Sequence, residues 1–397
     1  MIEKLIDKIG GNYYGNPSKV KISKEAKGLI EEAFSDIEGN FFDNHVHIIG
    51  KGTGNTGCWA NPDIFTWKHP QDYLKIIIYK SGSGITDMEK ADQQYLERLK
   101  TLASSFPVNG KFMLLALDKV YDKEGNERLY DTKFYIPNEY IINICRQYPE
   151  KYIPAISVHP YRKDALQELD KYGRMGVRVV KWIPNTMGMD PSDPLCDPFY
   201  EKMKEHDMVL LGHAGKETAI EVTKYKLLGN PLHYRRPLDK GVKVILAHCA
   251  TLGTGIDTEE GFKPVKNYKL FFRLMEEKKY EGLLFGDISA IIQINRMGKP
   301  LKAVLQKEEI HHRLINGSDY PLPAINAVVS TKAMHTLNYI SSREAELLNE
   351  IYKMNPLLFD FVLKRNLRDP DTGREAFPAS VFQDNQVLGL TKKPVFV

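Results

Sequence analysis

Eight short apolar runs, each ended by turn residues, constrain the fold of this chain more than any other feature. Stretches with a helical pattern lie between several of them or after the last, at 164–172, 198–206, 266–279 and 324–334. Near-continuous apolar strands that alternate with helices predict a parallel sheet covered by helices. Eight such strands predict closure into a TIM-type (β/α)8 barrel. The runs are residues 41–47, 112–117, 152–158, 177–183, 208–213, 243–248, 283–288 and 313–318.

The barrel accounts for about residues 40–365 of the single domain that we expect over 1–397. We expect an N-terminal helical extension over 1–39, in which Ser23 caps a helix that runs to about Ile37. A helix pair near 341–365 and an irregular tail over 366–397 form the C-terminal part.

Residues 71–106 allow two interpretations. The apolar stretch 75–79 fits either a further strand or the middle of a helix. We expect two helices broken near 81–84, because the number of strands is then eight. Residues 48–70 are rich in Gly, Asn, Thr and Trp and indicate a long functional loop.

Polar residues end five of the apolar runs. His45 and His47 are one residue apart, so both imidazoles face the same side of a strand and are able to bind a single ion. The residues that end the other four runs are Lys181, His213, His248 and Asp319.

The spacing of these residues supports the barrel. The gaps are 32 residues from Lys181 to His213, 35 from His213 to His248, and 71 from His248 to Asp319. One βα unit of a barrel averages ~31 residues, so the gaps correspond to one, one and two units. The sequence therefore predicts a functional site at the carboxyl ends of the strands.

The composition excludes several classes of protein. The charged residues are interspersed, the net charge is +4, and no block of like charges suggests a nucleic-acid or membrane partner. The four cysteines contain no CxxC pair, which argues against disulfides and a structural zinc site. We expect a cytoplasmic protein without a secretory signal, with a small-molecule substrate as partner, and homo-oligomerisation is compatible with the terminal extensions.

Six segments carry a resemblance to a known group of enzymes. They are FFDNHVH, GVRVVKW, VLLGHAG, VILAHCAT, FGDISA and INGSDYP, which come in this order along residues 40–365. With them the chain resembles the amidohydrolase superfamily, and within it the amidohydrolase-related group that includes aminocarboxymuconate-semialdehyde decarboxylase-like enzymes.

The resemblance implies roles for individual residues. The metal ligands of the family match His45, His47, His213 and Asp319. Three imidazoles and one carboxylate suit a divalent ion such as Zn²⁺ and leave a position open for water. In one-ion relatives the residue that matches His248 polarises the substrate or moves a proton.

The resemblance also leaves the number of ions open. Lys181 matches a lysine that is carboxylated and bridges two ions in some relatives, and is an unmodified cation near the substrate in others. We favour a single ion.

Each of these residues has an alternative structural role. A pair of strand-end histidines can simply be solvated, Asp319 fits an Asx-type turn, and His248 fits a buried core histidine. Lys181 fits a side chain that reaches solvent or pairs with a carboxylate.

Four further residues lie near the predicted site. Asp43 shares the inward side of the first strand with the histidines on strict alternation, as an orienting or structural acid. Asp287 is interpreted as part of the scaffold or as a residue behind the ligands, rather than as a ligand itself, and His159 carries no assigned role. Cys249 follows His248 and is expected to point towards the helices, which disfavours a nucleophilic role.

The leading hypothesis is a metal-dependent hydrolase. Asp319 acts in it as general base, and His248 or Lys181 stabilises the oxyanion. The alternative is a non-oxidative decarboxylase that uses the same metal site. A metal-binding barrel without catalysis is the third hypothesis.

Overall fold

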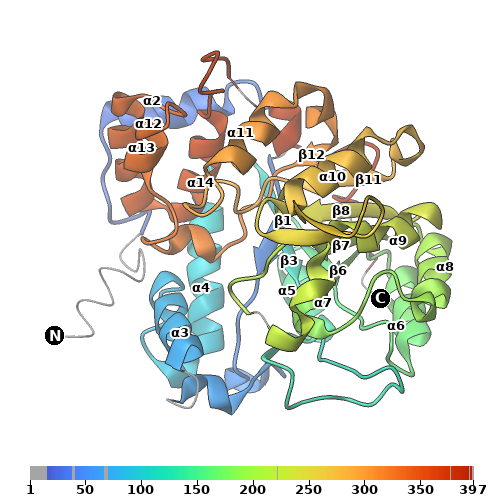
Figure 1. The fold of residues 1–397 in the computed structure, drawn as a ribbon. Helices are drawn as coiled ribbons and strands as arrows, with labels where there is room; N and C mark the ends of the chain where they lie inside the picture. The colour runs from blue at the N-terminus through green and yellow to red at the C-terminus, as the bar shows by residue number, and fades with distance from the viewer. Residues whose placement is uncertain are drawn as a thin grey trace.

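Eight parallel strands form a nearly closed barrel in the computed structural model, which describes residues 16–37, 41–66, 70–220, 222–375, 377–392 and 394–395 (Figure 1). Their order in the sheet is their order in the chain, so each strand pairs with the next one. All eight predicted runs are confirmed as strands. They are β1 (Phe41–His47), β3 (Gly110–Leu115), β5 (Tyr152–Ile156), β6 (Val179–Trp182), β7 (Val209–His213), β8 (Lys243–Ala247), β11 (Leu284–Asp287) and β12 (Leu314–Ile315).

Backbone hydrogen bonds close the barrel between its first and last strands. The Asn44 amide donates to the carbonyl of Asn316 at 3.0 Å, and the Asp319 amide donates to the carbonyl of His45 at 2.8 Å. The His47 amide continues the seam by donating to Tyr320 at 3.0 Å. The segment after β12 therefore lies directly beside the two histidines of β1.

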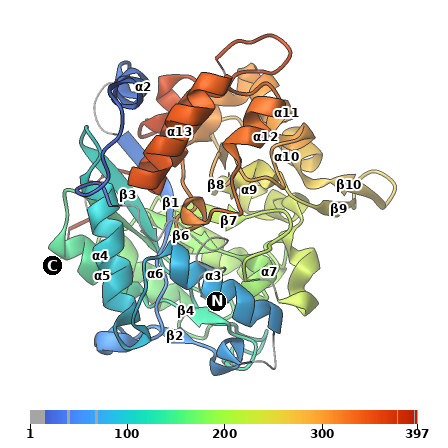
Figure 2. The same ribbon diagram turned by 90° about the vertical axis from the view of Figure 1, so that its left-hand side faces the viewer.

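Helices surround the barrel, as the two views show (Figures 1 and 2). None of the helices in the described part of the chain is long and apolar enough to cross a membrane. The helices are α2 (Lys24–Phe34), α3 (Pro70–Gly82), α4 (Ala91–Ser104), α5 (Asn138–Gln147), α6 (Ala165–Arg174), α7 (Pro184–Met187), α8 (Asp197–Glu205), α9 (Arg235–Asp239), α10 (Asn267–Glu276), α11 (Lys299–Gln306), α12 (Thr331–Thr336), α13 (Ser342–Met354) and α14 (Pro356–Arg365).

Most predicted helices are confirmed. Residues 71–106 form the two helices α3 and α4, and 164–172, 198–206 and 266–279 correspond to α6, α8 and α10. The prediction of one helix over 324–334 is wrong. The Ser330 side chain accepts the amide of Ala333 and caps a short helix that begins only at Thr331.

The long loop after β1 is held by one buried carboxylate. Asp92, at the start of α4, accepts the backbone amides of Lys51 and Gly52 at 2.9 and 3.1 Å and the hydroxyls of Thr53 and Thr56 at 2.9 and 2.6 Å. Farther along, the two-residue strand β2 (Trp59–Ala60) pairs with β4 (Phe134–Tyr135). The described part of the loop, residues 48–66, is thus held in place by contacts with the rest of the fold.

The barrel interior is an apolar cluster that the C-terminal tail completes. Leu388 and Leu390 from the tail pack with side chains from all eight strands. The tail is fixed there by contacts at strand beginnings, because Arg178 and Lys111 donate to the carbonyls of Leu388 and Thr391, each at 3.4 Å. The strand members of the cluster are Phe42, Met113, Leu115, Ile153, Ala155, Val179, Val209, Leu211, Ile245, Phe285 and Ile315.

The N-terminal helix packs on the C-terminal helices. Ser23 caps α2 as predicted, and α2 ends at Phe34, slightly before the predicted end. The Phe34 ring lies 4.2 Å from that of Phe361 in α14, between ring centroids. Figure 1 shows α2, in blue, beside the C-terminal helices, in red. The predicted helical content of residues 1–15 and 38–39 falls outside the described residues. The hairpin of β9 (Thr254–Asp257) and β10 (Lys263–Lys266) projects from the side of the molecule away from α2 (Figure 2).

Candidate metal centre

An irregularity in β1 points both histidines of this strand into the barrel. Phe42 belongs to the interior cluster, whereas Val46 packs on the helix side. Strict alternation would place both residues on the same face. The pairing register with β3 shifts between Asp43 and Val46, and this extra residue brings His45 and His47 to the inward side.

The same irregularity corrects the expectation for Asp43. Its carboxylate accepts the amides of His45 and Ser318 at 3.0 and 2.9 Å and lies near Lys364 of α14, towards the helix layer. Burial raises the pKa of Asp43 to about 6. Asp43 therefore fixes the backbone on both sides of the barrel seam and does not share the face of the histidines.

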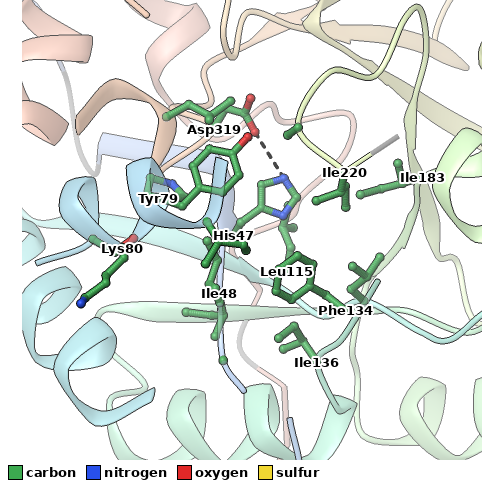
Figure 3. A pocket seen from close by; sticks show the side chains of 18 of the residues that line it. His47, Ile48, Tyr79, Lys80, Leu115, Phe134, Ile136, Ile183, Ile220 and Asp319 are labelled. Atoms are coloured by element: carbon green, nitrogen blue, oxygen red, sulfur yellow. Dashed lines mark ion pairs between the residues drawn. The ribbon is translucent and has the colours of Figure 1, made fainter. Parts of the chain in front are cut away.

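Three side chains from the first strand of the barrel and from the turn after its last strand converge at one point. The Nε2 atoms of His45 and His47 lie 3.2 Å apart, and Oδ1 of Asp319 lies 3.5 and 3.3 Å from them, respectively. Figure 3 shows this pairing of His47 with Asp319 as a dashed line. These three ligand atoms are close enough together to hold one ion.

Asp287 orients the first of these histidines. Nδ1 of His45 lies 2.7 Å from Oδ2 of Asp287, so the hydrogen-bond pattern assigns the ring proton to Nδ1 and leaves a lone pair on Nε2. Burial, aided by the charge of Lys181, holds the pKa of His45 well below its ordinary value. A carboxylate behind a histidine in this way fixes the tautomer that binds a metal.

Asp319 lies in a turn held close to β1. Its backbone has a φ of 61°, and Gly317 before it allows close packing, because a Cβ there would lie 2.6 Å from the Cβ of His45. Lys364 donates to the carbonyl of Gly317 at 2.6 Å from α14. Burial alone would raise the pKa of Asp319, but the hydrogen bond from His47 and the nearby basic groups lower it, so a carboxylate is favoured.

His213 lines the same cavity as the three converging side chains, and one of its ring nitrogens has no partner in the described part of the chain. Its Nδ1 is 3.4 Å from Oε2 of Glu217, whereas its buried Nε2 has no hydrogen-bond partner among the described residues. Burial lowers the pKa of His213 to about 4, so the ring is neutral at neutral pH. A neutral imidazole with an unpaired buried nitrogen fits a further ligand. His213 is not, however, within the same short distance of His45, His47 and Asp319 as these three are of one another.

Lys181 and His248 border the group. Lys181 is 1% exposed with Nζ 3.2 Å from Nε2 of His45, so the alternative of a lysine that reaches solvent is wrong. Burial lowers its pKa to about 8. The His248 ring stacks on that of His45 at 5.2 Å between centroids and lies 5.1 Å from that of His213.

A second group of ligand-type side chains is a hydrogen-bond network. His45, His248 and Asp287 also lie within reach of a shared ion. Their facing atoms are already bonded, since the second oxygen of Asp287 accepts the amides of His248 and Ser289 and Nδ1 of His248 lies 2.7 Å from the Ser289 hydroxyl. The group therefore supports the ligand set from behind.

Two residues that the sequence left without a role lie outside the cavity lining. The Cys249 thiol donates to the carbonyl of Asp287 at 3.2 Å, in the layer between strands and helices. His159 is buried, with Nε2 3.0 Å from the carbonyl of Met187. Neither side chain is placed to touch a substrate.

The cavity above the site is mostly apolar (Figure 3). The polar side chains in its wall that were not predicted include Tyr79, Glu217, Gln293 and Arg296. Glu217 follows His213 by four residues, and this spacing alone is only weak evidence in the sequence that Glu217 lies beside the site. The others come from α3 and from the turn after β11, and no strand-end pattern marks them. The apolar lining includes Ile48, Ile76, Leu115, Phe134, Ile136, Ile183 and Ile220.

Solved structures with some similarity include two decarboxylases and a hydratase. The 5-carboxyvanillate decarboxylase of Novosphingobium aromaticivorans, with bound manganese, is 14% identical over 81% of this chain and 95% of that one, with a TM-score of 0.44. The same enzyme of Sphingomonas paucimobilis is 14% identical over 79% and 96%, with a TM-score of 0.42. The 4-oxalomesaconate hydratase of Rhodopseudomonas palustris is 15% identical over 78% and 88%, with a TM-score of 0.38.

Sequence comparison gives one further result. Among curated proteins, none matches the chain significantly. The model of the amidohydrolase family matches residues 112–324, which is more than half of the chain.

Proposed function

The chain belongs to the amidohydrolase family, and from this premise we propose that it is a metal-dependent hydrolase of a small organic molecule. The observation that carries the proposal is the convergence of His45, His47 and Asp319 in one cavity at the carboxyl ends of the strands. This is the end of a TIM barrel at which catalytic sites lie.

A divalent ion fits the donors that the site offers. His45, His47 and Asp319 would hold it, with His213 as the fourth ligand through its unpaired nitrogen. Zn²⁺ suits three imidazoles and a carboxylate. When bound, such an ion supplies a Lewis acid that polarises a carbonyl group and makes water more acidic.

Asp319 is the residue that we assign to proton transfer. Its low pKa keeps it a carboxylate at neutral pH, and it faces the cavity beside His47. A carboxylate in this position is able to take the proton of an attacking water and to pass it to the leaving group.

Lys181 suits oxyanion stabilisation better than His248 does. With a pKa of about 8 its ammonium group is largely protonated at pH 7, and it carries donors into the cavity. His248 has a pKa well below its ordinary value, and its Nδ1 lies 3.1 Å from the Ser289 carbonyl, which only accepts. The proton of His248 is thus on Nδ1, so its other ring nitrogen accepts a proton rather than donating one.

A non-oxidative decarboxylase is the second candidate. The buried ammonium of Lys181, 3.2 Å from His45, favours a substrate carboxylate next to the ion. A decarboxylase releases carbon dioxide without consuming water, whereas a hydrolase places an oxygen atom of water in its product.

The test measures turnover of the zinc- or manganese-loaded protein on panels of esters, amides, lactones, imines and aromatic carboxylates. We expect hydrolysis with label from ¹⁸O water in the product, and a loss of about 10²–10⁴-fold in kcat for Asp319→Asn. Asp371→Asn changes an exposed aspartate paired with Lys302 and serves as the control with unchanged activity. Carbon dioxide without label supports the decarboxylase. No turnover by the metal-loaded protein on any panel contradicts both candidates.

A further inference from the structure

Arg296 is a buried guanidinium in the wall of the cavity. Its side chain is 4% exposed, and it lines the same cavity as Asp319 and His213. Nη1 donates to the hydroxyl of Thr251 at 2.9 Å, and Nε is buried without a hydrogen-bond partner in the described residues. No carboxylate of the described part of the chain forms an ion pair with it.

A buried charge of this kind requires compensation. An arginine stays protonated at any ordinary pH, and leaving an ion buried without a partner costs several kcal/mol. The guanidinium has a planar fork of donors that matches the two oxygens of a carboxylate. Asp319, Glu217 and Asp287 attract the guanidinium from a distance, but none of them pairs with it. Its unpartnered Nε is therefore left for an anion that enters the cavity.

We propose that Arg296 binds a carboxylate of the substrate, so that the substrates of this protein are small carboxylic acids with an apolar body. The inference rests on the proposed function for its site and adds the class of molecule that the site accepts.

The position of Arg296 is fixed relative to the metal centre. Thr251, which holds Nη1, donates to the carbonyl of His248 at 2.7 Å, so the guanidinium is tied to the turn that follows β8. The positive charge of Arg296 lies near enough to lower the pKa of His213 and His248, after burial itself. A carboxylate on Arg296 would hold the rest of the molecule beside the metal centre.

The remaining cavity wall indicates what the carboxylate is attached to. Gln293, one turn before Arg296 in the chain, is 7% exposed and adds an amide donor. Most other lining residues are aliphatic or aromatic, and Figure 3 shows Leu115, Phe134 and Ile220 around the open space. On this wall of the cavity, the fork of Arg296 and the amide of Gln293 suit the two oxygens of a carboxylate on an apolar body.

The test measures binding by calorimetry with the metal-loaded protein. The probes are phenylacetate and hexanoate, each compared with its uncharged amide. We expect the native protein to prefer the carboxylates by at least about 10-fold, the order expected for a charged hydrogen-bonded pair. Arg296→Met should remove this preference. Arg313→Met changes another buried arginine outside the cavity and should keep it.

Two further arms identify the group that binds the carboxylate. If the ion alone binds it, chelation removes the preference while Arg296→Met keeps it, and the proposal is wrong. A higher affinity for phenyl phosphate than for phenylacetate also overturns it. Arg296→Lys retains the charge without the fork and should give an intermediate preference, which keeps the test valid if the methionine variant does not fold. Because binding is measured, an absence of hydrolysis contradicts the proposed function and leaves this result intact.

Discussion

His159 shows how one buried side chain makes the stability of this protein depend on pH. Nδ1 of the ring accepts the amide of Tyr161 at 3.2 Å, and Nε2 donates to the carbonyl of Met187 at 3.0 Å. Both nitrogens are satisfied only in the neutral ring. Burial, as the main cause, lowers the pKa of His159 to about 3.

The sign of the pH dependence follows from this shift. The unfolded chain has an ordinary histidine pKa of about 6.5, so it binds more protons than the folded chain between about pH 6.5 and 3, and stability falls as the pH falls. We expect His159 to reduce the free energy of unfolding by about 2 kcal/mol between pH 7 and pH 5. The measurement is urea unfolding of the native protein and His159→Gln at both pH values.

The variant should be less stable than the native protein at pH 7, and the difference should shrink by about 2 kcal/mol at pH 5. His312→Gln removes an exposed histidine as a control. Its difference in free energy of unfolding from the native protein should be the same at pH 7 and at pH 5. An equal difference between native protein and His159→Gln at the two pH values would show that His159 is not held neutral by the fold.

At the residue scale, the sequence predicts where the site residues lie along the strands better than it predicts which side chains they hydrogen-bond. The alternation in a strand placed His45 and His47 on one side, and the spacing of strand ends placed Lys181 and His213 near them. The hydrogen bond from His45 to Asp287 depends on a side chain 242 positions away. Arg296 lies in an irregular turn, so no periodicity marks it.

The C-terminal tail is the element whose role differs most from its irregular sequence. Leu390 is fully buried in the interior of the barrel, at the end opposite the candidate metal centre. Contacts at the beginning of the strands, such as Lys243 with the carbonyl of Val387 at 3.3 Å, fix the tail there. The tail therefore closes the amino-terminal end of the barrel core.

Shortening the Leu390 side chain of the tail should lower the stability of the protein and leave the metal centre in place. We expect Leu390→Ala to reduce the free energy of unfolding by about 2–5 kcal/mol, because it leaves a cavity in a packed core. Denaturant unfolding measures the loss, and metal affinity should stay within about twofold, since the centre is at the other end of the strands.

Val387→Ala offers a control within the same segment. Val387 is 54% exposed, so its truncation should change the free energy of unfolding by about 0.5 kcal/mol or less. A Leu390→Ala variant as stable as Val387→Ala would mean that the tail does not fill the barrel in solution.

At the element scale, regular structure was predictable and its interruptions were not. The eight strands and the helices α3, α4, α6, α8 and α10 follow from apolar pattern and period. The extra residue in β1 lies at the pairing with β3 and beside Asn316, which is far along the chain, so no local pattern marks it. The late start of α12 results from the cap at Ser330, which the apolar pattern of 324–334 obscured.

Contacts between the first and last strands close the barrel and so hold together distant parts of the whole molecule. Asn44 and Asn316 meet across the seam although 272 positions separate them in the chain. The candidate metal ligands straddle the same seam, since His45 and His47 come from β1 and Asp319 follows β12. An ion held there would join the first and last strands of the barrel, and it has no comparable site in the unfolded chain.

Metal binding should therefore stabilise the whole fold. A ligand that binds only the folded state at 100 times its dissociation constant adds about 2.7 kcal/mol to the free energy of unfolding. We expect Zn²⁺ to raise the denaturant midpoint of unfolding of the native protein, and to raise it further as the Zn²⁺ concentration increases above the dissociation constant. Mg²⁺ prefers oxygen ligands and should raise it much less. Asp319→Asn removes the carboxylate ligand at nearly constant shape and should lose most of the Zn²⁺ effect. An equal Zn²⁺ effect in the variant would place the ion away from the seam.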